Sequence, residues 1–224
     1  MSLAGNSNLI KTNWKSPPAD PMVLMQDWVK QAHSAKITEP LGMTLTTVNP
    51  AGWAWSRVVL VKELNQASII FGSSSSSDKG QDIEHNAKVA GNLWWRESVQ
   101  QIHFRGYATI APPFKSDLLW QTRSRSAQAI AVCSQQSQPL ISELDFKTKV
   151  AAWESSEQIL SRPLSWNAYQ ITPIEYEFWQ GDASRLHKRL RYSLQIPNID
   201  FAQASNLAEL VIKSGIWTQQ RLQP

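Results

Sequence analysis

The stretch from residue 42 to residue 111 limits the fold most strongly, because it is a series of short segments typical of strands. Met43–Val48 alternates in polarity, Asn49–Gly52 has the composition of a turn, and Trp53–Lys62 continues as a second strand. A short helix is expected at Asp78–Asn86, among three further strands: Ala67–Gly72, Val89–Trp95 and Gln100–Ala111. Several short antiparallel strands are most economically closed as a barrel. The sequence therefore predicts a mainly β, α+β fold built on an antiparallel barrel.

The N-terminal part divides into an arm and a helix. Residues 1–19 are polar and contain prolines, so we expect an arm that is flexible or draped over another surface. Asp20 and Pro21 are typical of a helix start. The helix would turn an apolar stripe to the core: Leu24, Trp28 and Ala32. Since no internal repeat or linker is evident, residues 20–224 are predicted to form a single domain.

The C-terminal half alternates between helices and strands. Helices are expected at residues 114–125 and 142–161. The second of these is expected to bury one side: Leu144, Val150, Trp153 and Leu160. Strands are expected in three segments: Ala168–Gln180, Arg185–Ser193 and Gly215–Leu222.

The composition excludes several classes of protein. Hydrophobic residues make up 42% and charged residues 18% of the chain, as in globular rather than disordered proteins. Cys133 is the only cysteine, so an intrachain disulfide or a cysteine-cluster metal site is impossible, and the 4 histidines lack metal-ligand spacing, so no metal is expected. There is no long apolar run, and Met1–Asn6 lacks the features of a secretion signal. We therefore expect a cytoplasmic protein with no membrane partner.

The most informative local feature is a basic segment near the C-terminus. If Arg185–Ser193 is a strand, its period of two places four side chains on one face: Arg185, His187, Arg189 and Arg191. Three cations and an imidazole repel each other unless an anion lies opposite, so they indicate an anion-binding wall with a proton-handling group. A solvated basic face is the simpler alternative. The nearby Trp179 favours a site.

Two other groups of residues suggest phosphate binding. The hydroxyls of Ser73–Ser77 lead into a helix start with Lys79, where free N–H groups favour an anion, although a serine run is more often a flexible turn. Arg57 and Lys62 lie five apart on an apolar strand, so they leave opposite faces, and at least one must meet a carboxylate or an anion. Polar side chains suited to a heterocycle or a phosphate occur elsewhere: Gln101, Gln136 and Ser137.

Common catalytic motifs are absent, but a family resemblance is present. The chain has no Gly-rich dinucleotide motif, Walker loop, Gly-x-Ser-x-Gly elbow or HExxH motif. Nearly all of it after residue 19 resembles the pyridoxamine 5'-phosphate oxidase family. The segments Glu177-Phe178-Trp179-Gln180-Gly181 and Arg185-Leu186-His187 carry the resemblance most specifically. Further matching segments are Arg57–Lys62, the Lys79 helix, Gln101, Ser134–Ser137 and Arg221–Pro224.

The resemblance implies an FMN-binding split β-barrel that works as a homodimer, with two flavins at the subunit interface. The residues implied in cofactor binding are Arg57, Val58, Val59, Leu60, Lys62, Gly72, Ser73, Lys79, Gln101, Gln136, Ser137, Trp179 and Arg189. Lys62 and Arg123 would hold a substrate phosphate. Arg185 and His187 would contact the substrate as catalytic residues over the reactive face of the flavin.

Some positions depart from the family pattern. Leu119 and Ala127 stand where the family has a phosphate-binding tyrosine and serine, and Asp78 replaces an arginine that binds the flavin phosphate. The arm also lacks the arginine and tyrosine of the family's lid. Each lost hydrogen bond to a buried phosphate costs about 1.5–3 kcal/mol, so a weaker site for a substrate phosphate is expected.

These departures leave the substrate open. The FMN oxidases of phenazine biosynthesis, which act on a reduced tricyclic aromatic acid, are similar in Trp94–Glu97, Gln100–Ile102 and Trp120, whereas Lys62 resembles the vitamin enzyme. The sequence predicts an oxidase that passes a hydride equivalent from a small aromatic or phosphorylated substrate to FMN and then to O₂. The default substrate is pyridoxamine or pyridoxine 5'-phosphate. The alternatives are the phenazine-type oxidase and a non-catalytic flavin sensor; a nucleic-acid-binding barrel is disfavoured because the basic patch is small.

Overall fold

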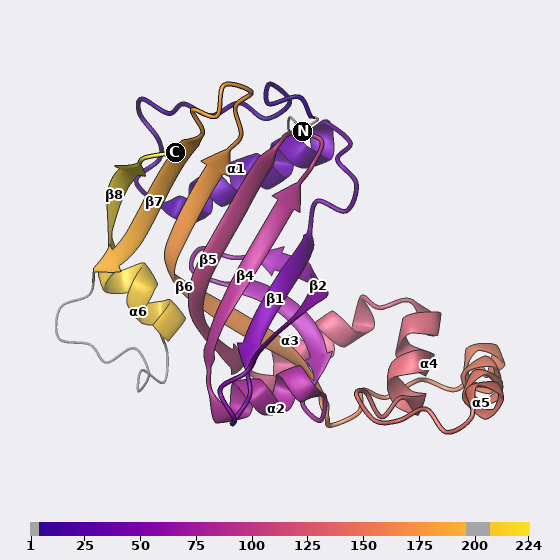
Figure 1. Ribbon diagram of the computed structural model, residues 1–224. Helices are drawn as coiled ribbons and strands as arrows, with labels where there is room; N and C mark the ends of the chain where they lie inside the picture. Colours follow the sequence, from indigo (N-terminus) through magenta and orange to yellow (C-terminus); the bar gives the residue numbers. More distant parts are fainter. Residues whose placement is uncertain (1–4, 196–206) are drawn as a thin grey trace.

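The computed structural model describes residues 5–195 and 207–224, which form one antiparallel sheet of 8 strands with associated helices (Figure 1). The strand order is β3-β2-β1-β4-β5-β6-β7-β8, and an additional pairing of β3 with β6 closes a six-stranded barrel that β7 and β8 extend. The strands are β1 (Gly42–Val48), β2 (Ala54–Leu64), β3 (Ile69–Ser74), β4 (Lys88–Trp95), β5 (Gln100–Ile110), β6 (Trp166–Gln180), β7 (Lys188–Gln195) and β8 (Ile216–Leu222). The predicted α+β fold with an antiparallel split barrel is confirmed.

The described residues also form helices, some of which pack against the barrel while others project from it (Figure 1). The helices are α1 (Pro21–Ser34), α2 (Asp78–His85), α3 (Pro113–Gln121), α4 (Arg125–Cys133), α5 (Glu143–Ser155) and α6 (Leu207–Ser214). Within residues 5–195 and 207–224, none of them combines the length and the apolar composition needed to cross a bilayer.

Helix α1 begins where the sequence predicts. The Asp20 side chain accepts a hydrogen bond from the Met22 amide at 2.8 Å, and Pro21 occupies the first turn, where its missing N–H costs nothing. The buried stripe of α1 includes Trp28, whose ring packs edge-on against Phe178 at 5.2 Å and beside Trp95 at 6.3 Å. The helix is therefore fixed to β4 and β6 by aromatic packing.

Replacing Asp20 by alanine is expected to destabilise the protein by about 1 kcal/mol, because the first turn loses its capping acceptor. Urea denaturation at neutral pH measures the change, with the exposed Asp27→Ala variant of the same helix as the control. An Asp20→Ala variant as stable as the control would contradict this account of the helix start.

Residues 5–19 of the N-terminal arm lie over one end of the barrel, one of the two expected arrangements. Ile10 is fully buried in the main core. Trp14 donates from Nε1 to Gln180 Oε1 at 2.9 Å, and Gln100 donates to the Ile10 carbonyl at 3.3 Å. The arm thus lies against the start of β5 and the end of β6.

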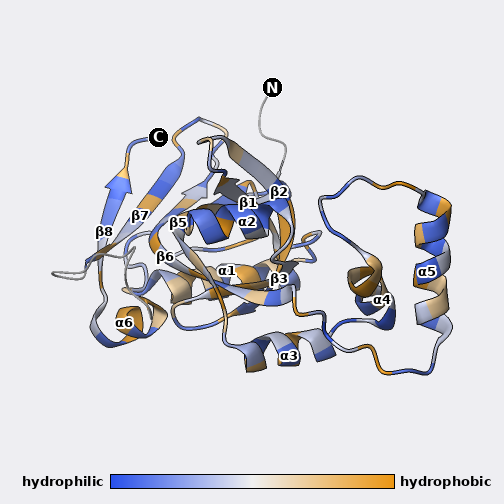
Figure 2. Ribbon diagram, turned by 90° about the horizontal axis from the view of Figure 1, so that it is seen from below, coloured by the Kyte–Doolittle hydropathy of each residue, from blue (hydrophilic) through white to orange (hydrophobic). Residues whose placement is uncertain are grey.

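The region between β5 and β6 differs from the prediction. In place of one helix over residues 114–125, α3 ends at Gln121 and α4 starts after Ser124, whose side chain accepts from the Ala127 amide. Helix α5 ends at Ser155 rather than at residue 161, and none of its residues is buried. Leu144 is 75% exposed, so its predicted burial is wrong. Both α4 and α5 project away from the barrel (Figures 1 and 2). Val150 and Trp153 of α5 are partly buried against a smaller apolar cluster in which Leu160 is buried, as predicted for these three residues.

The predicted strand at Arg185–Ser193 begins three residues later, at Lys188. The preceding residues form a turn in which Asp182 Oδ1 accepts from the Ser184 amide at 2.8 Å and Arg185 has a left-handed φ of 66°. Arg185 and His187 therefore lie in a loop. The alternation that placed them on one strand face with Arg189 does not apply.

Candidate functional site

A cavity of about 280 Å³ opens between β2, β3 and α4. It brings together 7 of the predicted cofactor residues: Val58, Val59, Leu60, Gly72, Ser73, Lys79 and Gln136. Arg123, predicted to bind substrate, also lines it. We call this cavity the anion pocket, because Lys79 and Arg123 line it.

Lys79 is a positively charged residue of the anion pocket that is buried from solvent. It lies in the first turn of α2, whose N-cap Ser77 accepts from the Gly80 amide and from Lys79 Nζ at 3.0 Å. Only 7% of the Lys79 surface is exposed. Burial, and then repulsion by Arg57, lower the pKa of Lys79 to about 8, against an opposing effect of Asp78. A bound anion would offset both the burial of the Lys79 charge and its repulsion by Arg57.

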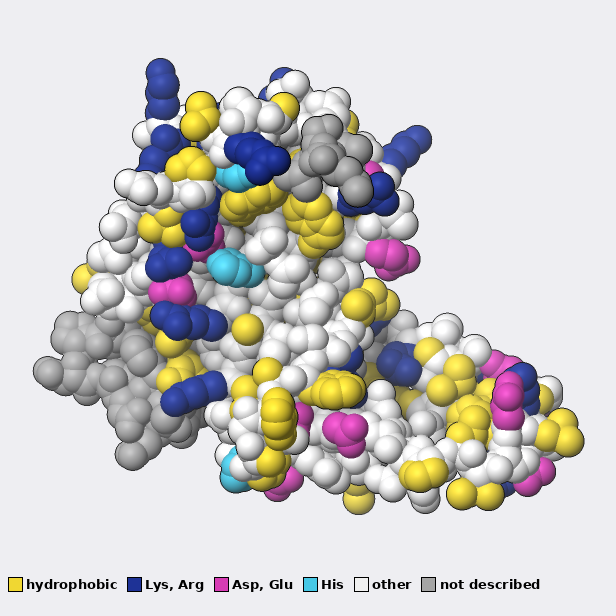
Figure 3. All heavy atoms as spheres, in the orientation of Figure 1, with side chains coloured by type: hydrophobic (Ala, Val, Ile, Leu, Met, Phe, Trp, Pro, Cys, Tyr) yellow, Lys and Arg dark blue, Asp and Glu magenta, His cyan; other side chains and the backbone are white. Residues whose placement is uncertain are grey.

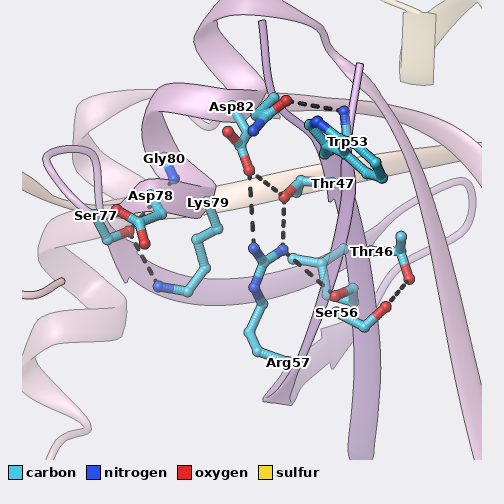
Figure 4. Close-up of polar contacts among 12 residues, drawn as sticks. Thr46, Thr47, Trp53, Ser56, Arg57, Ser77, Asp78, Lys79, Gly80 and Asp82 are labelled. Atoms are coloured by element: carbon cyan, nitrogen blue, oxygen red, sulfur yellow. Dashed lines mark hydrogen bonds and ion pairs between the residues drawn. The ribbon is translucent and has the colours of Figure 1, made fainter. Parts of the chain in front are cut away.

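Arg57 lies next to Lys79, and polar contacts with other side chains fix its guanidinium (Figure 4). Its Nη1 donates to Thr47 Oγ1 at 2.6 Å, and its Nη2 lies 3.8 Å from Asp82 Oδ2. Thr47 donates to the same carboxylate at 2.6 Å. As predicted, Arg57 meets a carboxylate. Burial lowers the pKa of Arg57, while Asp82 and Asp78 oppose this effect.

The anion pocket fits a phosphate-bearing cofactor. The Ser73 hydroxyl is buried without a hydrogen-bond partner, which is costly unless a ligand binds it. At Gly72 a β-carbon would lie 2.5 Å from the Trp166 ring, so only glycine leaves room for the backbone here. A buried hydroxyl with no partner among the described residues, together with the neighbouring cations Lys79 and Arg57, is typical of a phosphate site.

Arg123 enters the pocket between two aromatic rings. Its guanidinium lies 4.9 Å from the Trp166 ring centroid and 5.7 Å from that of Trp120, and Nη2 donates to the Ala127 carbonyl at 2.7 Å. Burial lowers the pKa of Arg123, and its Nε has no partner among the described residues. Leu119 is buried in the adjacent apolar cluster. The surroundings of Arg123 are therefore mostly apolar.

Two other predicted residues, Lys62 and Ser137, do not line the anion pocket. Lys62 is exposed on the outer face of β2 and borders a separate groove with Leu41 and Leu64, so the structure does not bring it into the anion pocket. The burial pattern of β2 confirms that Arg57 and Lys62 leave opposite faces. Ser137 lies just beyond Gln136 and accepts from the Asp78 amide at 3.1 Å.

A second group of predicted residues lies at the other end of the barrel. Gln101, Trp179 and Arg189 are neighbours across β5, β6 and β7, in a row that β4 extends with Trp94. Trp94 lies six residues along β4 from Lys88, the first residue of that strand, which directly follows α2. The row therefore lies about 20 Å along β4 from the end of the barrel at which α2 lies (Figure 1). The two groups are separate within one chain.

The basic wall contains its own counterion. Glu177 is buried between Arg189 and Arg191, with Oε1 at 2.7 Å from Arg189 Nε and Oε2 at 3.0 Å from Arg191 Nη2. Figure 3 shows the basic, acidic and histidine side chains gathered over β5 to β8. Arg189 and Arg191 share a face as predicted, but the anion opposite them is a carboxylate of the protein.

The two predicted catalytic residues lie in the loop after β6. The Asp182 amide donates to His187 Nδ1 at 3.0 Å, so a neutral imidazole carries its proton on Nε2. The His187 ring lies 4.9 Å from the Trp179 ring. Arg185 is exposed, and its guanidinium has no hydrogen bond or ion pair with residues 5–195 or 207–224. Both side chains can meet a ligand beside Trp179.

Three supporting residues were not predicted from the sequence: Thr47, Asp82 and Trp166. Asp82 and Thr47 hold Arg57, and Trp166 flanks Arg123. The spacing of Lys79 and Asp82 on one helix face is a signal that could have revealed Asp82. The described part of the chain has no group of three or more His, Cys, Asp or Glu residues suited to a metal ion.

Two family models match the chain. Residues 29–156 match the model described as pyridoxamine 5'-phosphate oxidase, and residues 166–224 match the pyridoxine 5'-phosphate oxidase C-terminal dimerisation region. The first range contains most residues that line the anion pocket, among them Lys79 and Arg123, and the second contains Trp179 and Arg189.

Relatives of two kinds are similar to the chain. A pyridoxine/pyridoxamine 5'-phosphate oxidase from Bacteroides fragilis is 33% identical over 211 residues, covering 92% of this chain and 82% of the relative. A dihydrophenazinedicarboxylate synthase from Burkholderia lata is 32% identical over 191 residues, covering 85% and 90%. The crystal structure of PhzG from Burkholderia lata 383 in complex with tetrahydrophenazine-1-carboxylic acid matches with a TM-score of 0.83 and 30% identity, covering 94% and 95%. On these grounds the chain belongs to the pyridoxamine 5'-phosphate oxidase family.

Proposed function

We propose that this protein is an FMN-dependent oxidase that uses O₂ as the electron acceptor. The observation that carries the proposal is the anion pocket, which the buried Lys79 lines with Arg57 beside it, and where the Ser73 hydroxyl has no hydrogen-bond partner among the described residues. A flavin phosphate would supply the missing negative charge. When bound, FMN would supply the redox chemistry, namely hydride acceptance and reaction with O₂.

A homodimer would complete the site. The anion pocket and the row of Gln101, Trp179 and Arg189 lie far apart in one chain, so one flavin is best enclosed by the pocket of one subunit and the row of the other. The outer face of β2 leaves Val58 69% exposed, as expected of a surface that a second subunit covers. The match to a dimerisation region over residues 166–224 agrees with this arrangement.

The chain's own residues would bind and orient the substrate. Arg185 offers an unpaired guanidinium that can hold an anionic or carbonyl oxygen of the substrate. His187 keeps its Nε2–H directed away from the Asp182 amide, so it can donate a hydrogen bond or move a proton at that atom. Trp179 beside His187 would limit water at the same place.

The default substrate is pyridoxamine or pyridoxine 5'-phosphate, but three features favour a second candidate. Leu119 and Ala127 provide no side-chain hydrogen bond for a substrate phosphate, and Lys62 lies outside the pocket that Arg123 lines. These features suit a reduced tricyclic aromatic carboxylic acid, whose carboxylate needs one arginine and whose rings need apolar surfaces.

Purified protein tests both candidates directly. We expect flavin absorbance in the folded protein, or uptake of added FMN, and peroxide formation with one substrate class. Turnover of pyridoxamine 5'-phosphate without turnover of a reduced phenazine carboxylic acid would exclude the second candidate, and the reverse would exclude the first. A folded sample that takes up no FMN would overturn the proposed function, whereas bound flavin without turnover would favour a sensor.

A further inference from the structure

Glu177 is the most heavily engaged carboxylate of the described residues. Its side chain is 5% exposed, although it stands on the outer face of β6, because three basic side chains cover it. Arg189 approaches Oε1 through Nε and Nη2, each at 2.7 Å, while Arg191 Nη2 and His103 Nε2 lie 3.0 and 3.5 Å from Oε2. Burial alone would raise the pKa of Glu177, but the hydrogen bonds from Arg189 and Arg191 hold it below its usual value.

The register of the sheet explains why these groups meet. His103, Glu177 and Arg191 are direct neighbours across β5, β6 and β7. One step along the same face, Trp179 is paired with Arg189. Glu177 thus bonds diagonally to Arg189, which is one step nearer to the His187 loop. This diagonal contact fixes the long arginine side chain in one orientation.

Arg189 is held at a second point but keeps capacity for a ligand. Its Nη1 donates to the Gln223 carbonyl at 3.2 Å, near the end of the chain. A guanidinium has five N–H donors, so donors remain after Glu177 and Gln223 are bound. The side chain is half-buried, with 30% exposure. Such a pre-oriented cation binds an electron-rich ring or an anion without first losing rotamer freedom.

We propose that Glu177 is a positioning residue for the flavin pocket: its buried carboxylate orients Arg189 beside Trp179, so that Arg189 meets the bound flavin in a preset geometry. This inference rests on the proposed function. The alternative is an ion pair that stabilises the sheet and has no effect on ligand binding. The positioning role and the purely stabilising role predict different flavin affinities once the Glu177–Arg189 ion pair is broken.

The test measures the FMN dissociation constant of the full-length apoprotein by flavin fluorescence, together with its melting temperature. Glu177→Gln is expected to weaken FMN binding at least about tenfold and to change the absorbance spectrum of the bound flavin. The matched control is Glu175→Gln, which breaks the Arg105 ion pair in the next row of the same face. Its FMN affinity should equal that of the wild type.

A double-mutant cycle assigns the effect to Arg189. If Glu177 acts through Arg189, Glu177→Gln adds no further loss of FMN affinity in an Arg189→Met background. Additive losses, or a lower melting temperature with unchanged FMN affinity, would refute the positioning role. Absence of FMN binding by the wild type would instead refute the proposed function.

Arg189→Lys keeps the test valid should Glu177→Gln fail to fold. Lysine retains the charge but cannot match the two-nitrogen contact with Glu177, so we expect the same loss of FMN affinity as in Arg189→Met. Arg191→Met leaves the Glu177–Arg189 contact and should bind FMN nearly as the wild type does. Wild-type affinity in Arg189→Lys, or equal losses in Arg189→Met and Arg191→Met, would contradict the proposal.

Discussion

Replacing Lys79 by methionine is expected to weaken FMN binding by about 10- to 150-fold. The estimate follows from losing one charge-assisted hydrogen bond to a phosphate, worth about 1.5–3 kcal/mol. Fluorescence titration of the apoprotein with FMN measures the loss. The control is Lys88→Met, which removes an exposed lysine of β4 outside the pocket.

The same substitution should make the apoprotein more stable at neutral pH. Burial lowers the pKa of Lys79 to about 8 in the folded protein, from an ordinary lysine value of 10.5, so folding disfavours its charged form. The resulting cost is fully present below pH 8 and disappears as the pH rises towards 10.5. The stability advantage of Lys79→Met over the wild type should therefore be largest near pH 7 and should shrink at higher pH.

Thermal denaturation of both apoproteins between pH 7 and pH 10 tests this expectation, in a buffer free of phosphate. Adding inorganic phosphate should stabilise the wild type more than Lys79→Met, because the anion binds the charged lysine. A variant that binds FMN normally, or that is less stable than the wild type at neutral pH, would contradict our description of the anion pocket.

Replacing Arg185 or His187 by alanine is expected to lower kcat by about 10²- to 10⁴-fold, the usual range for a group that moves or orients a proton. Flavin retention should change little, since neither side chain lines the anion pocket. The Arg185 guanidinium is unpaired within the described part of the chain, and the His187 Nε2–H is directed away from the Asp182 amide, so both residues can serve the substrate rather than the fold.

Single-turnover reduction of the bound flavin by substrate measures this loss, and flavin absorbance after gel filtration measures retention. Leu186→Ala is a close control, because Leu186 lies between the two residues and is 69% exposed. If flavin and turnover are lost in equal proportion, Arg185 and His187 belong to cofactor binding and our assignment fails.

Local signals in the sequence predicted most elements of the barrel. The cap at Asp20 and the proline after it start α1 at the predicted residue, because both act within one turn of chain. Trp94 and Trp95 alternate between exposed and buried positions, as neighbours on a strand must. The helix at Asp78–His85 forms for a similar reason, since Ser77 caps it locally.

The predictions from sequence are wrong where a competing local structure, or a lack of tertiary contacts, determines the conformation. The turn of Asp182 and Ser184 delays β7 to Lys188, against an alternation that favoured an earlier start. Helix α5 has no buried residues because it projects from the barrel, so an apolar pattern at Leu144 does not imply burial there.

By itself the sequence determined the family, the antiparallel barrel and the cationic residues in and beside the anion pocket. Only the tertiary structure decided which of these charges are already neutralised: Glu177 faces Arg189, and Asp82 faces Arg57, while Lys79 forms no ion pair with a carboxylate of residues 5–195 or 207–224. The physical reason is that charge compensation depends on strand register and helix placement. Residues far apart in the chain become neighbours only when the barrel closes.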